Sequence, residues 1–200
     1  MFALVDKSDN SITRMLSGSQ GITLDGIQHP KAIFSLWTKD EREAIGVYEV
    51  EMDTSKRKDE KWYINTNVTY SFGSGKVTGS YGDATARAHA DTKWTAQDES
   101  DGKGTEGDVK DEGLKTKLIR TIKLQAEGEL NKTDWYVTRK SEKSTAIPSA
   151  VTTHRDAVRS KQSSMETAIT NASDTPALET LYTRNNEGVR PLGDIPKKDF

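Results

Sequence analysis

Three residues have the types and spacing of a metal-binding set. His89 and Asp91 lie two positions apart, and His154 follows far downstream, which together imitate the two-histidine, one-carboxylate triad that holds ferrous iron. However, His89 follows an alanine-rich polar stretch and a long polar segment separates it from His154. These surroundings favour solvent-facing or packing roles for all three side chains. A non-haem iron-dependent oxygenase is therefore kept as the alternative hypothesis.

Other catalytic patterns lack the context that their chemistry needs. The chain has no cysteine, so it has no thiolate zinc ligand, no cysteine nucleophile and no disulfide. Gly73-x-Gly75 falls inside a hairpin pattern rather than between a strand and a helix, where phosphates bind. Neighbouring carboxylates such as Asp98 and Glu99 fall in a hydrated segment where nothing separates their pKa values. The sequence predicts a non-enzymatic protein with no cofactor and no metal.

Composition narrows the class of partner. The 200 residues include 29 basic and 31 acidic side chains, so the chain lacks the positive surplus that attracts phosphate backbones. Only 32% of the residues are hydrophobic, and no window has the apolar length needed to span a bilayer. We therefore expect no nucleic acid and no membrane among the partners, and a protein made in the cytoplasm.

The second half of the chain contains two helix patterns joined by a short motif. Leucine, isoleucine and alanine side chains recur every four residues from Leu114 to Ala126, and valine and methionine recur every seven from Val151 to Met165. Both segments predict amphipathic helices. The joining motif, Thr133-Asp134-Trp135, offers an N-cap residue and a large ring that we expect to cover the apolar faces of the pair.

This region resembles the small domain of bacteriophage tail assembly chaperones and tail-fibre-associated proteins. The resemblance rests on Thr133-Asp134-Trp135, on a spacer that ends at Pro148, and on a helix that contains residues 154–159. Arg120 and the leucines of residues 124–130 precede the motif as in that family. His154 and Val158 stand where the family typically has tyrosine and leucine. The segment from Gly26 to Val47 similarly resembles the openings of small phage tail proteins.

The resemblance implies a non-enzymatic phage tail protein that acts through protein–protein contacts. One form of this function is a tail or tail-fibre assembly chaperone, which holds an apolar surface of its partner until that partner is incorporated. The other is a small virion component near the baseplate or fibre. The implied partners are other phage tail or tail-fibre proteins, or further copies of this chain. The implied location is the host cytoplasm during assembly, or the virion tail.

The first half predicts a small mixed unit with a β-hairpin. Alternating residues predict a strand over 2–5 that pairs with 22–24, a further strand over 45–51, and a hairpin over 64–78 that turns at Gly73-Ser74-Gly75. Thr38-x-x-Glu41 has the spacing of a helix capping box.

The fold class that we predict is α+β, with an N-terminal mixed unit, a C-terminal antiparallel helix pair and an extended tail. The predicted parts are an N-terminal domain over 1–96, a flexible acidic linker over 97–113, a helix-pair domain over 114–172 and a tail over 173–200.

Six residues are candidates for partner binding. The tryptophan and the two arginines are of types that dominate interfaces, and the three tail residues are spaced like side chains that dock into shallow pockets of a partner: Trp135, Arg155, Arg159, Tyr182, Ile195 and Phe200. Each has a second interpretation within the chain's own fold. Trp135 is suited to the core of the helix pair, the two arginines are suited to lie along a helix flank with their charged ends in water, and the tail residues are suited to dock on their own domain.

Overall fold

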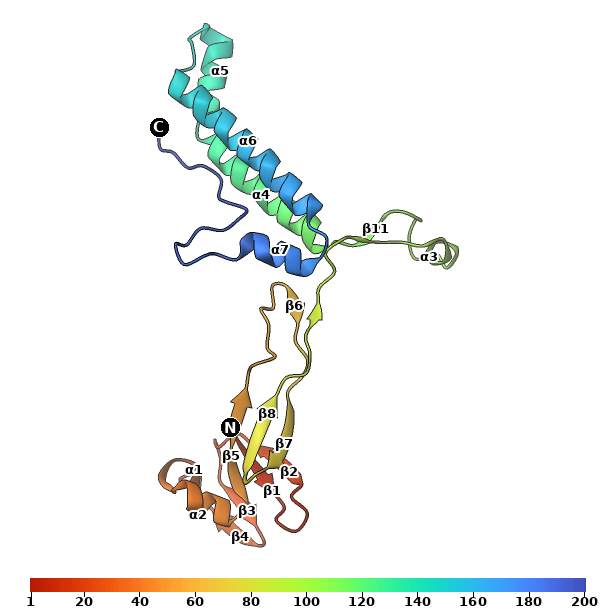
Figure 1. Ribbon diagram of the computed structural model, residues 1–200, viewed down its shortest axis with the longest axis vertical. Coiled ribbons are helices and arrows are strands. Elements are labelled where there is room, and N and C mark those ends of the chain that lie inside the picture. Colours follow the sequence, from red (N-terminus) through yellow and green to blue (C-terminus); the bar gives the residue numbers. More distant parts are fainter. The chain divides into compact units, whose positions relative to one another are not determined.

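A computed structural model describes residues 1–200, and the chain divides into two compact units, Met1–Thr85 and Ala86–Phe200 (Figure 1). Most strands belong to the first unit and the long helices to the second, which confirms the predicted α+β class. The division at residue 85 differs from the predicted boundary at residue 96. No helix is long and apolar enough to cross a membrane.

The first unit is built mainly from short strands. Its elements are β1 (Phe2–Val5), β2 (Ile12–Leu16), β3 (Ile22–Leu24), β4 (Ile27–His29), α1 (Ile33–Leu36), α2 (Lys39–Ala44), β5 (Val47–Asp53), β6 (Tyr63–Ile64), β7 (Thr69–Gly73) and β8 (Lys76–Ser80). The short β9 strand (Thr85–Ala86) includes the last residue of this unit and the first residue of the second. Five of these strands form one sheet in the order β2-β1-β5-β8-β7, and β7 returns close to β2. The β5 and β8 strands are parallel, and the other neighbours in this sheet are antiparallel.

The sheet buries side chains on both faces because successive residues of a strand point to opposite sides. On one face, Ala3, Val5 and Val77 form a buried cluster. On the other face, Val47 packs with Ile33 of α1. Every buried side chain of these two clusters is apolar.

Strand pairing in this unit differs from one sequence prediction. We expected residues 22–24 to pair with residues 2–5, but β3 pairs with β4 and β1 pairs with β2 and β5. The reason is local, since Asp25 and Gly26 between β3 and β4 both have positive φ, as a two-residue hairpin turn requires. The Asp-Gly signal for this turn was present in the sequence.

Two other local predictions are confirmed. Thr38 caps α2, with its hydroxyl accepting from the Glu41 N–H while the Glu41 carboxylate accepts from the Thr38 N–H. The turn between β7 and β8 has positive φ at Ser74 and Gly75, and the two strands pair across it. Both features depend on side chains within three residues of each other.

The second unit is mainly helical. Its elements are β10 (Thr92–Lys93), α3 (Ala96–Ser100), β11 (Val109–Asp111), α4 (Leu114–Asn131), α5 (Asp134–Lys143), α6 (Ser149–Asn171) and α7 (Thr175–Tyr182). The α4 and α6 helices lie side by side along their length, and α5 lies at one end of the pair (Figure 1). The predicted apolar faces are confirmed, because Leu118, Ile122, Val151, Val158 and Met165 are buried.

Ordered secondary structure stands where the sequence predicted a flexible linker over 97–113. Thr95 and Asp98 form a capping box at the start of α3, and β10 pairs with β11. Trp94 packs against Gly104 so closely that a Cβ at Gly104 would lie 2.5 Å from the ring. The Lys110 ammonium lies 4.7 Å from the centre of the same ring. This tryptophan gives the segment a small centre of packing that its polar composition concealed.

The predicted extended tail over 173–200 is corrected in its first part. Residues 175–182 form α7, because Asp174 accepts from the Ala177 N–H as an N-cap and Pro176 fits the first helical turn. Beyond α7 the chain folds back, with the Leu192 N–H donating to the Leu181 carbonyl. The rest of the tail has no helix or strand.

Candidate functional site

The Thr-Asp-Trp motif and the helix that follows it are joined by a single buried arginine. One nitrogen of Arg155, Nη1, lies 2.8 Å from the Leu130 carbonyl, 2.8 Å from Thr133 Oγ1 and 2.7 Å from Asp134 Oδ1. Arg155 is only 9% exposed. Its positive charge also suits the C-terminal end of α4, where carbonyl groups lack helical partners. Arg155 of α6 therefore holds the junction between α4 and α5 in place.

Thr133 serves this junction in an unexpected way. The sequence predicted that Thr133 or Asp134 caps the next helix, and Thr133 is the N-cap residue of α5. Its side chain makes no cap hydrogen bond, because the hydroxyl donates to the Leu130 carbonyl and accepts from Arg155. Thr133 is fully buried, so these bonds satisfy a polar group that has no access to water.

The tryptophan of the motif faces solvent, and Tyr136 beside it is partly buried. We expected Trp135 in the core of the helix pair, but it is 51% exposed. Its ring stacks on Tyr136 with centroids 3.7 Å apart, and the Arg139 guanidinium lies 4.8 Å from the Trp135 ring centre and 5.2 Å from that of Tyr136. The core prediction is wrong because the tight α4–α5 junction turns α5 away from the pair, none of its residues being buried. We call Trp135, Tyr136 and Arg139 the α5 cluster.

A second polar group is buried at the same end of the helix pair. His154 Nε2 lies 3.9 Å from Glu129 Oε2, and both residues are buried. The Lys132 ammonium donates to the two Glu129 carboxylate oxygens at 2.9 and 3.1 Å and, with the Lys198 backbone N–H, lowers the pKa of that carboxyl below its usual value. The His154 ring also lies 5.2 Å from the ring of Phe200. The end of the chain therefore docks on its own unit here.

The remaining candidate residues have mixed positions. Arg159 is exposed and forms only a 3.7 Å ion pair with Asp156. Ile195 is buried, and Phe200 is 49% exposed. Tyr182 is partly buried, which raises the pKa of its hydroxyl, and the Arg190 guanidinium lies 5.0 Å from its ring centre. Only Trp135, Arg159 and Phe200 of the six candidates are exposed enough to meet a partner directly.

The three residues of the oxygenase alternative are not brought together. Asp91 lies at the N-terminus of α4, where its carboxylate accepts from the Gly113 N–H at 2.7 Å and from the Thr116 hydroxyl at 2.8 Å. These two bonds lower the pKa of Asp91 below its usual value. His154 lies beside Glu129 near the other end of the same helix, which is about 27 Å long for 18 residues. No group of three or more histidine, aspartate or glutamate side chains is placed to hold a metal.

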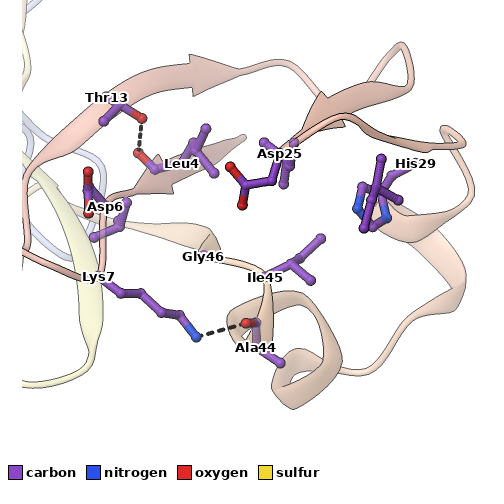
Figure 2. Close-up of a pocket in the computed structure, with 12 residues that line it drawn as sticks. Leu4, Asp6, Lys7, Thr13, Asp25, His29, Ala44, Ile45 and Gly46 are labelled. Carbon is purple, nitrogen blue, oxygen red and sulfur yellow. Dashed lines mark hydrogen bonds between the residues drawn. The ribbon is translucent and has the colours of Figure 1, made fainter.

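The first unit contains an open pocket of about 570 Å³, which is within the size range of ligand sites (Figure 2). It lies between β1, the β3–β4 hairpin and the corner that joins α2 to β5. Lys7 Nζ donates to the Ala44 carbonyl at 2.8 Å, so this cation already has a partner at the C-terminal end of α2. Asp25 lies at the pocket without a hydrogen bond or an ion pair. His29 also lines the pocket, and its ring lies 5.7 Å from the ring of Trp37.

Two members of the α5 cluster were not predicted from the sequence. Tyr136 and Arg139 were not candidates, although the spacing of Trp135 and Arg139 by four residues places them on one helix face. That spacing was the available signal. The buried role of Arg155 had no local signal, because its partners lie 21 to 25 residues away in the sequence.

Compared with protein-family models, with curated proteins and with solved structures, the chain matches none.

Proposed function

We propose that this chain is a non-enzymatic bacteriophage tail protein that acts through protein–protein contacts. It serves either as a tail or tail-fibre assembly chaperone or as a small component of the virion tail. The observation that carries the proposal is the α5 cluster, an aromatic and cationic group in which Trp135 is exposed and Tyr136 and Arg139 are partly buried, and which begins within the Thr-Asp-Trp motif of the resemblance.

The composition of the cluster supports a binding role. Tryptophan, tyrosine and arginine are the residues that contribute most to protein interfaces, and here they are adjacent on one short helix. The surface is also held in position, since Arg155 ties Thr133 and Asp134 at the start of α5 to α6. A contact surface that is fixed before binding loses less conformational freedom when a partner arrives.

The position of Arg155 accounts for the pattern that carries the resemblance. The Thr-Asp pair and the downstream arginine form one hydrogen-bonded group, and the tryptophan next to it points outward. Thr133, Asp134 and Arg155 thus support the surface, and Trp135 belongs to it. This division of roles supports binding by the motif rather than catalysis.

The proposal is tested by co-purification of the tagged chain from phage-infected cells. We expect a tail or tail-fibre protein to be retained, and Trp135→Ala to reduce its retention by at least about tenfold, as for other central interface tryptophans. Leu124→Ala is the matched control, because Leu124 is 61% exposed on α4 and lies outside the cluster. Equal retention by the wild-type protein and the Trp135 variant would count against the proposal.

Mass spectrometry of purified virions separates the two forms of the function. A structural component is expected at a fixed copy number per particle. An assembly chaperone is expected in the infected-cell lysate and not in the particle.

A further inference from the structure

The second unit carries an exposed acidic projection at the end of the helix pair opposite to α5. We call residues 92–112 the acidic arm. It contains seven acidic side chains and three basic ones, a net charge of −4, although the whole chain has a net charge of only −2. The seven acidic residues are Asp98, Glu99, Asp101, Glu106, Asp108, Asp111 and Glu112. In Figure 1 the arm extends away from the α4–α6 pair.

The opposite end of the same unit has the complementary charge. Residues 132–143 contain four basic and two acidic side chains, a net charge of +2. One of the two acids, Asp134, is already paired with Arg155. Lys140 and Lys143 form no ion pair or hydrogen bond through their side chains and lie next to the α5 cluster in the sequence. The surface is therefore aromatic and cationic, and it suits a partner that is acidic with some apolar area.

The acidic arm combines negative charge with some exposed apolar area, as such a partner requires. Val109 on β11 is 47% exposed, and Val137 on α5 is 44% exposed. Glu106 and Asp108 have exposed carboxylates without an ion pair, whereas Asp98 is held by Thr95, Lys103 and Lys110. The arm thus offers free carboxylates beside an exposed valine.

The arm cannot reach α5 within the same molecule. Its base is fixed at the N-terminus of α4, where Asp91 binds Gly113 and Thr116. The α5 helix begins beyond the C-terminus of α4, about 27 Å away for a helix of 18 residues. The arm also points away from the pair in Figure 1.

We propose that the acidic arm of one copy of this chain binds the α5 cluster of a second copy. The partner is a second copy because the chain carries both complementary surfaces and separates them by the length of α4. When the α4 helices of two copies lie antiparallel, each arm faces the other copy's α5, and the contact closes as a two-fold dimer. The inference does not depend on the phage tail function.

Light scattering of the full-length chain tests the contact. We expect twice the monomer mass of 22.2 kDa at about 0.1 M salt, and a dimer that weakens toward about 1 M salt, where the screening length falls from about 10 Å to about 3 Å. The double variant Glu106→Lys/Asp108→Lys should weaken the dimer by about tenfold or more, because like charges would then face each other.

Charge exchange makes the test specific. The variant Lys140→Glu/Lys143→Glu should weaken the dimer as well. Mixing it with the Glu106→Lys/Asp108→Lys protein should restore association, because both contacts of the mixed dimer then pair opposite charges. The control Glu127→Lys/Glu187→Lys makes the same charge change at two exposed residues without side-chain partners and should leave association unchanged. Circular dichroism checks that each variant retains its helices. A monomer in all conditions, or a dimer that no charge change affects, would overturn the proposal.

A covalent test is available because the chain has no cysteine. Glu106→Cys and Lys143→Cys proteins, mixed and oxidised, should form a disulfide-linked heterodimer, since a disulfide requires Cα atoms within about 7 Å. Glu187→Cys replaces Glu106→Cys in the control mixture. Equal crosslinking in both mixtures would contradict the proposed contact.

Discussion

The two units bury different kinds of residue. In the first unit, the buried side chains of both clusters are hydrophobic and lie on the two faces of one sheet. In the second unit, five polar or charged residues are buried among the helices: Glu129, Thr133, His154, Arg155 and Thr175. Four of them, all except Thr175, lie at the α4–α5–α6 junction, and the candidate surface lies beside them.

The first unit is thus stabilised by apolar packing, and the second also contains buried hydrogen bonds with specific partners. Apolar burial stabilises a unit without fixing direction, whereas a buried hydrogen bond is favourable only with correct partners. A mixed sheet can tolerate small apolar rearrangements. The α5 cluster needs a defined orientation, and Arg155 supplies it through three acceptors on one nitrogen.

The largest expected effect concerns the apolar core of the first unit. Ile33 is fully buried on α1, so Ile33→Ala should lower the free energy of unfolding of this unit by about 2 to 5 kcal/mol through lost burial and a cavity. Leu36 on the same helix is 78% exposed, and Leu36→Ala should change it by less than about 0.5 kcal/mol. Hydrogen exchange of residues 1–85 as a function of urea measures both. Similar losses of unfolding free energy in the two variants would contradict the placement of Ile33 in the core.

A polar substitution should have an effect of nearly the same size in the second unit. Arg155→Met leaves Thr133 and Asp134 without their partner and should cost about 2 to 4 kcal/mol, somewhat below a fully buried ion pair because Asp134 is half exposed. Arg159→Ala, one helical turn further on, should cost less than about 0.5 kcal/mol. Urea unfolding followed by far-ultraviolet circular dichroism compares the two. A small effect at Arg155 would remove the contrast between the units.

Acid should loosen the second unit at the start of α4. Bonds from Gly113 and Thr116 lower the pKa of Asp91 below its usual 3.8, so the ionised form stabilises the fold. That stability is fully present above the unfolded-state pKa and is lost as the pH falls through the lower folded-state value. Asp91→Asn should therefore make the helical signal of this unit less dependent on pH between about pH 4 and pH 2. An unchanged acid transition would show that this carboxylate does not support α4.

The smallest effect on stability is expected at the candidate surface. Trp135→Ala removes a half-exposed ring whose main contacts are Tyr136 and Arg139, and it should cost less than about 1 kcal/mol. The same change should strongly reduce partner retention. A thermal melt beside the co-purification assay separates these outcomes, and a large loss of stability would assign Trp135 to packing.

Much of the local structure was predictable because its causes lie within a few residues. The Thr38–Glu41 capping box, the turn at Ser74–Gly75 and the apolar spacing of α4 all formed as expected. Two local signals were available but missed, namely the Asp25–Gly26 turn and the Asp174 cap with Pro176. Because these two signals were missed, the predicted partner of residues 2–5 was wrong and the predicted extended tail was too long.

The candidate site was predictable only in part. The sequence alone placed Trp135 in the motif that joins the two predicted helices and Arg155 on the second of these helices, but it did not determine which of them faces solvent. The tertiary structure assigned the core position to the charged arginine and the surface position to the tryptophan, because three acceptors at the end of α4 converge on Arg155.

The sequence by itself determined the α+β class, the two long helices and their apolar faces, since these follow from hydrogen bonds and side-chain periodicity within single segments. Only the tertiary structure decided that Asp91 caps a helix 22 residues further on and that Arg155 binds residues 21 to 25 positions before it. Such pairs depend on which acceptors the folded chain brings within reach. No spacing along one element encodes that choice.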